Sequence, residues 1–165
     1  MATATQTVNP TFNCTLCKGI LVPTSFCCYK NKTQRRKGPK NGSEIFHTII
    51  GAAIEVHRTL GGPGLLEGVY ESCLCHELML RGLHVQRQLI VPVNYKGTAV
   101  KDPLFIDILV QDKVIVEVKS TEKEHPIHQV QLLIYLRLTG RKLGLLVNFG
   151  REYVKDGISR VVNGL

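Results

Sequence analysis

Two acidic residues and a lysine lie close together in the middle of the chain, where a short loop separates two apolar segments. Asp107 precedes the loop at residues 111–113, and Glu117 and Lys119 follow it. If the segments form a β-hairpin, Asp107 faces Glu117 with Cβ atoms about 5 Å apart, and Lys119 lies on the same face. Two such carboxylates repel each other unless a cation lies between them, and Mg²⁺ is commonly held by one or two carboxylates. The pattern predicts a metal site that activates water against a phosphodiester, with Lys119 orienting the water or stabilising phosphoryl charge.

The hydrophobic pattern selects the register of this hairpin. Around a three-residue loop, the opposed apolar pairs are Ile106–Val118, Ile108–Val116 and Val110–Val114. This register makes one face of the hairpin wholly apolar and places the charged residues on the other, whereas a shift by one residue would scatter both kinds. The alternative interpretation is a solvated hairpin face, on which Lys119 merely offsets the two acids.

Polar residues on two predicted helices extend the group. Glu67 lies in the first turn of one helix, with Tyr70 three residues later on nearly the same side, while His128, Gln131 and Tyr135 form a polar stripe on another. A glutamine and a tyrosine four residues apart can contact a nucleotide or orient a metal-bound group. Alternatively, Glu67 is an ordinary partner of the helix dipole and the stripe is a solvated face.

The apolar periodicity predicts the elements that position these residues. In order, we expect helices at 43–60 and 63–81, strands at 85–95, 104–110 and 114–119, a helix at 126–139, and strands at 143–149 and 158–162. Ser43 caps the first helix, Pro63-Gly64 opens the second, and Lys96-Gly97 makes a turn. This order predicts an α/β sandwich with a mixed sheet, in which an antiparallel meander is followed by a helical crossover.

Residues 1–42 differ from the rest of the chain in charge. They hold seven basic and no acidic residues, whereas the remaining 14 basic residues nearly balance 13 acids, so the net charge of +8 belongs mostly to this segment. We expect a flexible basic tail ahead of one domain at residues 43–165. A transit peptide is the alternative reading of the tail, and an organellar location would then replace the expected cytoplasmic one.

The cysteines of the tail form a weak zinc pattern. Cys14 and Cys17 make a CxxC, but Cys27 and Cys28 are adjacent, and neighbouring cysteines reach one metal poorly. We therefore expect unpaired thiols and a reducing compartment, with a zinc module that recruits a partner as the alternative for the tail. No apolar run approaches the ~20 residues needed to span a bilayer, so no membrane partner is expected. Motifs of P-loop proteins, zinc proteases and serine hydrolases are also missing from the sequence.

Several of these residues resemble known nuclease motifs. Gly64–Tyr70 matches the GxxExxY signature, and Ile106-Asp107 with Glu117–Lys119 matches the D…ExK core of the PD-(D/E)XK nuclease superfamily. Gln131 and Tyr135 resemble the QxxxY element of RecB-type exonuclease domains. The chain thus resembles a GxxExxY family protein of this superfamily, over residues 45–163.

The resemblance implies a restriction-endonuclease-like αβββαβ sandwich with an extra N-terminal helix and a Mg²⁺-dependent nuclease site, in which Mn²⁺ is a substitute. Asp107 and Glu117 are then metal ligands and Lys119 the catalytic lysine, with Glu67 as a supporting acid. Auxiliary substrate-binding positions are His128, Gln131 and Tyr135. DNA is the expected substrate, and RNA is the alternative.

The chain departs from the family pattern in its tail, which lies outside the pattern, and at two further places, of which Phe105 concerns substrate contact. Phe105 stands where many relatives are expected to carry a basic residue, and Gly61-Gly62 is one glycine longer than usual. The competing function is a non-catalytic module of the same fold, in which the basic tail binds nucleic acid.

Overall fold

The structure is a computed structural model that describes residues 41–164. The flexible-tail, targeting and zinc predictions for residues 1–40 lie outside the described residues, and the proposed division into a tail and a domain stays a prediction. None of the helices described over residues 41–164 is long and apolar enough to cross a bilayer.

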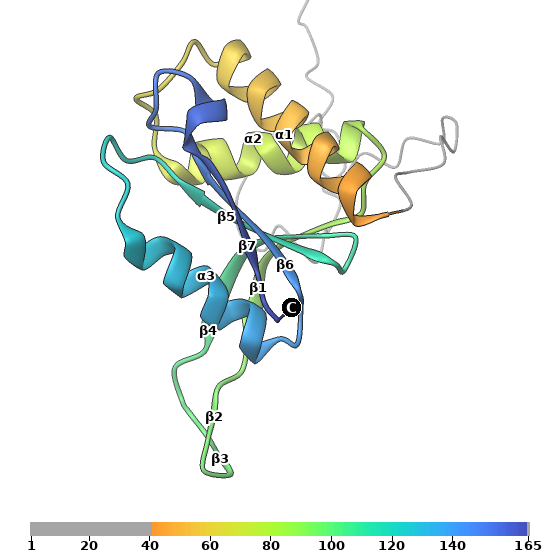
Figure 1. The fold of residues 1–165 in the computed structure, drawn as a ribbon, viewed down its shortest axis with the longest axis vertical. Helices are drawn as coiled ribbons and strands as arrows, with labels where there is room; N and C mark the ends of the chain where they lie inside the picture. The colour runs from red at the N-terminus through yellow and green to blue at the C-terminus, as the bar shows by residue number, and fades with distance from the viewer. Residues whose placement is uncertain (1–40, 165) are drawn as a thin grey trace, which may run out of the picture. The chain divides into compact units, whose positions relative to one another are not determined.

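A mixed five-stranded sheet carries helices on both faces (Figure 1). The helices are α1 (Gly42–Thr59), α2 (Glu67–Leu80) and α3 (Pro126–Leu138). The strands, in sheet order, are β1 (Val85–Val91), β4 (Leu104–Val110), β5 (Val114–Lys119), β6 (Leu143–Asn148) and β7 (Ile158–Val162). Only β5 and β6 pair in parallel, and α3 is their crossover. A 3₁₀ turn, η1 (Val154–Gly157), precedes β7. This confirms the predicted restriction-endonuclease-like α/β fold with an additional N-terminal helix.

The first two helices begin elsewhere than the sequence predicted. Asn41, not Ser43, caps α1, because its side-chain oxygen accepts the backbone N–H of Glu44 at 2.9 Å. Helix α2 begins at Glu67 and not at Pro63-Gly64. The reason is conformational: Gly62 and Gly64 have φ of 105° and 115°, a left-handed backbone that cannot continue a right-handed helix.

The predicted strand over 85–95 is also interrupted. Strand β1 ends at Val91, and a separate small hairpin of β2 (Asn94–Tyr95) and β3 (Thr98–Ala99) follows. The predicted turn at Lys96-Gly97 is confirmed, with both residues at positive φ, as two-residue hairpin turns require. This small hairpin lies at the far end of β1 and β4 from helices α1 and α2 (Figure 1).

Each face of the sheet buries its own hydrophobic core. Helices α1 and α2 pack over one cluster, which includes Ile108, Val110, Val114 and Val116. Helix α3 packs over the other, which includes Ile106. The prediction that Ile106 shares an apolar face with Ile108 was therefore wrong, because β4 changes face between them. The prediction of a single apolar hairpin face also missed the second core, because the paired residues Leu109 and Ile115 bury the opposite face of the hairpin under α3.

Candidate active site

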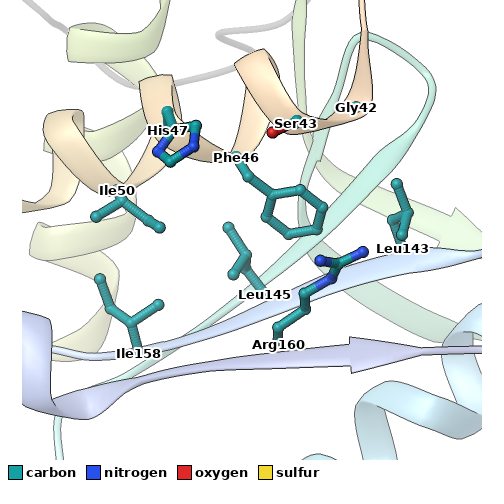
Figure 2. A pocket seen from close by; sticks show the side chains of 9 residues that line it. All are labelled: Gly42, Ser43, Phe46, His47, Ile50, Leu143, Leu145, Ile158 and Arg160. Carbon is teal, nitrogen blue, oxygen red and sulfur yellow. The ribbon is translucent and has the colours of Figure 1, made fainter.

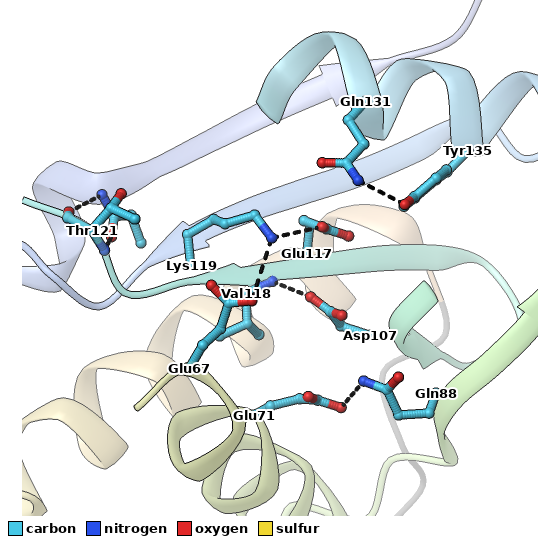
Figure 3. Close-up of polar contacts among 11 residues, drawn as sticks. Glu67, Glu71, Gln88, Asp107, Glu117, Val118, Lys119, Thr121, Gln131 and Tyr135 are labelled. Atoms are coloured by element: carbon cyan, nitrogen blue, oxygen red, sulfur yellow. Dashed lines mark hydrogen bonds and ion pairs between the residues drawn. The ribbon is translucent and has the colours of Figure 1, made fainter. Parts of the chain in front are cut away.

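Asp107 lies where the pairing between β4 and β5 stops. The predicted register is confirmed at Val110–Val114 and Ile108–Val116. The β4–β5 ladder ends at Ile108–Val116, one residue before Asp107 is reached. Instead, Oδ2 of Asp107 accepts the backbone N–H of Val118 at 2.9 Å (Figure 3). Burial raises the pKa of Asp107, although the Val118 N–H and Lys119 oppose the rise. The strands thus separate at their open end, and a carboxylate takes the place of a backbone acceptor.

Glu117 is the most deeply buried acid of the group, with 3% of its surface exposed. Its Oε1 accepts a hydrogen bond from Lys119 Nζ at 2.9 Å, while its Oε2 is buried with no hydrogen-bond partner among the residues that the structure describes. Burial raises the pKa of Glu117 to about 7, and the neighbouring charge of Asp107 adds to the rise despite Lys119. An unsatisfied carboxylate oxygen at this depth is costly unless a ligand or a proton occupies it.

Lys119 lies between two carboxylates. Its Nζ is 2.9 Å from Glu117 Oε1 and 3.5 Å from Glu67 Oε1, so it joins β5 to the start of α2 (Figure 3). Burial by itself lowers the pKa of Lys119, but the charges of Glu117, Glu67 and Asp107 outweigh it, and the net shift is upward. Lys119 is therefore a protonated ammonium at neutral pH and a hydrogen-bond donor rather than a base.

Tyr70 supports the loop that leads to Glu67, and its side chain is buried whereas that of Glu67 is half-exposed. Its hydroxyl donates to the Gly62 carbonyl at 2.7 Å and accepts the Leu65 N–H at 3.3 Å. The ring is fully buried and stacks on Phe149, with centroids 4.5 Å apart. The tyrosine of the GxxExxY pattern is thus a structural anchor in this chain, and the glutamate is the polar member at the site.

The polar stripe of α3 faces the same cluster. Gln131 Nε2 donates to the Tyr135 hydroxyl at 2.7 Å, a contact that was not predicted from the sequence (Figure 3). Burial raises the pKa of Tyr135, and the charges of Glu117 and Asp107 contribute in the same direction. Burial also lowers the pKa of His128, with a further contribution from Lys119. The structure therefore brings all seven predicted site residues into one neighbourhood.

Sequence reasoning missed three further polar residues beside this group. Glu71, with only 5% of its surface exposed, accepts hydrogen bonds on one oxygen from Arg87 Nε at 2.7 Å and Gln88 Nε2 at 2.8 Å. The available signal was the position of Glu71 one helical turn after Glu67. An acid between Tyr70 and Leu74, both buried, has to be paired with a donor.

The described residues supply only some of the ligands that a divalent cation requires. Within residues 41–164, no group of three or more His, Cys, Asp or Glu side chains is arranged to hold a metal ion. However, Asp107 and Glu117 supply two carboxylates, one of them with an unpartnered buried oxygen, and Mg²⁺ commonly completes such a set with water. The cluster as a whole holds four carboxyl groups (Glu67, Glu71, Asp107 and Glu117) and two cationic side chains (Lys119 and Arg87). This donor set, rich in carboxyl oxygens, suits a hydrated dication.

Two pockets lie outside this polar cluster. One is an apolar groove of about 420 Å³ beside the site, lined by Leu104, Ile127, Val130, Gln131, Ile134 and Tyr135. Phe105 does not line it; its side chain is half-exposed, and the residue pairs with Ile90. The other, of about 350 Å³, lies where α1 meets β6 and β7, with the Arg160 guanidinium 4.9 Å from the Phe46 ring centroid (Figure 2). No predicted site residue lines this second pocket.

Comparison with known proteins identifies the family. No curated protein and no solved structure is significantly similar to the chain. The narrower GxxExxY assignment stays a prediction. The family model of the PD-(D/E)XK nuclease superfamily matches residues 43–161, a segment that contains the carboxylates, the lysine and the α3 stripe described above. The chain therefore belongs to the PD-(D/E)XK nuclease superfamily.

Proposed function

We propose that this protein is a metal-dependent nuclease that hydrolyses phosphodiester bonds of DNA with Mg²⁺, for which Mn²⁺ can substitute. The observation that carries the proposal is the buried Oε2 of Glu117, which has no hydrogen-bond partner among the described residues, beside a second, half-buried carboxylate, Asp107. A stable core does not need this arrangement, because two apolar residues would satisfy the same volume at lower cost. Superfamily membership supports nuclease chemistry in general.

In this proposal Asp107 and Glu117 hold the ion, and Glu67 supports it from the start of α2. When bound, a divalent cation lowers the pKa of a coordinated water and polarises the phosphoryl group. Glu117 would offer the oxygen that has no partner among the described residues, and Asp107 the oxygen not engaged by Val118 N–H. The buried setting strengthens both interactions, because little water screens them.

Lys119 acts as the catalytic cation. Its raised pKa keeps it protonated, so it donates a hydrogen bond to the phosphoryl oxygens as negative charge develops there. Glu117 and Glu67 hold the ammonium from two sides and thereby orient it before substrate arrives. Of the two roles open to Lys119, charge stabilisation fits the protonated state best.

The α3 stripe would contact the nucleotide next to the scissile bond. Gln131 and Tyr135 are held by their mutual hydrogen bond, which fixes their polar atoms at the edge of the carboxylate cluster. The lowered pKa of His128 favours the neutral ring, which can accept or donate a hydrogen bond without adding charge.

The free thiols of Cys73 and Cys75 support action in a reducing compartment, and we propose the cytoplasm.

Cleavage assays test the proposal directly. Purified full-length protein is incubated with single-stranded DNA, double-stranded DNA and RNA of the same sequence, with Mg²⁺, with Mn²⁺ or with a chelator. We expect metal-dependent cleavage of DNA, and a loss of about 10³-fold in rate for Glu117→Ala, equivalent to about 4 kcal/mol. Glu122→Ala, at an exposed acid three residues after Lys119, is the matched control.

Three outcomes would contradict the proposal in different ways. DNA cleavage that Glu117→Ala leaves intact would remove the assigned site. Cleavage of RNA alone would reject the DNA substrate. Salt-sensitive DNA binding without cleavage, lost when residues 1–40 are deleted, would favour the non-catalytic binding module instead.

A further inference from the structure

The ribbon formed by β1 and β4 turns over at one pair of residues, Gln88 and Asp107. On one side of this pair, Val85 and Ile108 pack toward α1 and α2. On the other side, Leu89 and Ile106 pack toward α3. The register is continuous through the switch, with Arg87 paired to Ile108 and Leu89 to Ile106, but Gln88 and Asp107 between them form no ladder pair. Both strands therefore change face together, at the pair that contains Asp107, the predicted metal ligand.

The backbone of Gln88 makes the switch possible. Its φ is 51°, in the left-handed region that a residue with a Cβ rarely adopts inside a strand. Such a conformation persists only where surrounding contacts hold it. Its side chain supplies one such contact, because Gln88 Nε2 donates to Glu71 Oε1 at 2.8 Å.

Glu71 is well placed to hold Gln88. It is almost completely buried on α2, and its Oε1 accepts the Arg87 guanidinium at 2.7 Å as well as the Gln88 amide. Two consecutive residues of β1 are thus bound to one atom of a rigid helix. Figure 3 shows the Glu71–Gln88 contact beside Asp107, which extends toward Val118 on the opposite strand.

We propose that Glu71 is a positioning residue that holds the Gln88 backbone in its left-handed form and thereby aims the Asp107 carboxylate at the site. Residues that orient a metal ligand from behind commonly change metal affinity by about 10- to 100-fold when they are removed. The part of the inference that concerns metal affinity and rate rests on the proposed function. The part that concerns the Asp107 side chain does not, because its hydrogen bond to the Val118 N–H joins two groups of the chain itself.

Amide hydrogen exchange at Val118, measured by NMR on the metal-free full chain, tests the positioning itself. Glu71→Ala and Gln88→Ala each remove the contact, and Gln88→Ala leaves the Glu71–Arg87 ion pair in place. Gln86→Ala is the matched control, since Gln86 lies on the same strand and donates to Asp112 in the loop at 2.9 Å. We expect Val118 exchange to become at least about tenfold faster in both test variants, relative to Ile115, and to stay unchanged in the control. Unchanged Val118 exchange in Gln88→Ala overturns the inference, even if Glu71→Ala fails to fold.

The Glu71→Gln variant distinguishes the effect of the hydrogen bond with Gln88 from that of the negative charge on Glu71. Its amide oxygen can still accept from Gln88, so Val118 protection should return toward that of the wild-type chain. An exchange rate as fast as in Glu71→Ala would overturn a role based on this hydrogen bond.

Manganese binding and kinetics then test the functional consequence. We expect Gln88→Ala to weaken Mn²⁺ binding by about tenfold and to lower kcat by a similar factor, with KM for DNA unchanged. If the wild-type chain neither binds Mn²⁺ nor cleaves DNA, the proposed function fails while the Val118 result still decides the positioning. If Val118 exchange rises but Mn²⁺ affinity and kcat match those of Gln86→Ala, the positioning role for catalysis is overturned.

Discussion

The two ends of the β4–β5 hairpin are built from opposite kinds of residue. At the loop end, Val110 pairs with Val114 and Ile108 with Val116, and all four side chains are fully buried. At the open end the ladder stops, and the half-buried Asp107 lies near the buried Glu117, whose Oε2 has no hydrogen-bond partner among the described residues.

This difference indicates a division of work along one pair of strands. Burial of branched aliphatic side chains at the loop end stabilises the hairpin and sets its register. Burial of carboxylates at the open end destabilises the metal-free fold, because desolvation disfavours their charged forms. The stability contributed by the apolar end therefore offsets the stability lost at the polar site a few residues away.

The largest effect is expected from removing the charge at the open end while keeping its stem. Lys119→Met should lower kcat by about 10²- to 10³-fold, equivalent to about 3–4 kcal/mol, because the donor to the phosphoryl oxygens is lost. Mn²⁺ affinity, measured by calorimetry, should be retained or improved, since Lys119 no longer occupies Glu117 Oε1. Lys113→Met, in the loop at the opposite end, is the control. Equal kinetics for the two variants would contradict the assigned role.

A substitution at the loop end should lower the free energy of unfolding and leave the rate of cleavage almost unchanged. Ile108→Ala removes a fully buried side chain and is expected to lower the free energy of unfolding by about 2–4 kcal/mol, measured with denaturant. At temperatures well below its melting temperature, the kcat of Ile108→Ala should differ from that of the wild-type chain by less than about twofold. Phe105→Ala, at a half-exposed position on the same strand, should cost less stability. A kcat loss comparable to that of Lys119→Met would erase the contrast between the two ends.

A pH series sharpens the contrast for the metal-free protein. Burial raises the pKa of Glu117 from 4.5 to about 7, so the folded state binds this proton more tightly than the unfolded chain does. The associated stability is present below pH 4.5 and is lost as pH rises through about 7. Glu117→Gln should therefore be about 1–3 kcal/mol more stable than wild type near pH 8, with little difference near pH 4. Chemical denaturation in chelator measures this, and a pH-independent difference would argue against a buried ionised Glu117.

The smallest effect is expected outside the hairpin, at the anchor of the loop that leads to Glu67. Tyr70→Phe keeps the stacked ring but leaves the Gly62 carbonyl and the Leu65 N–H without the hydroxyl, at a cost of about 1 kcal/mol in unfolding free energy. Tyr153→Phe, at an exposed tyrosine, is the matched control. If both variants unfold at the same denaturant concentration, Tyr70 does not hold the loop through its hydroxyl.

Much of the fold was predictable because local signals were strong. The β4 and β5 boundaries and their three-residue loop follow from two runs of aliphatic residues on either side of the polar segment 111–113. The helix starts were less predictable. Asn41 and Ser43 are both good caps, and only the folded chain shows which oxygen reaches the Glu44 N–H.

The candidate site divides in the same way. Asp107, Glu117 and Lys119 could be grouped from residue type and register alone, because a period of two places them on one face. Glu71 could not be grouped with them, because its partners Arg87 and Gln88 lie on a strand whose course depends on a left-handed residue. No periodic pattern predicts such a residue.

By itself, the sequence determined the order of the main elements and the hairpin register, and it grouped the residues predicted to hold a dication, because these depend on short-range spacing and on the burial of apolar side chains. Only the tertiary structure decided that Tyr70 anchors a loop, that Ile106 belongs to the second core, and that Asp107 engages Val118 where two strands change face. These features depend on contacts between segments distant in sequence, whose geometry emerges only when both faces of the sheet are packed at once.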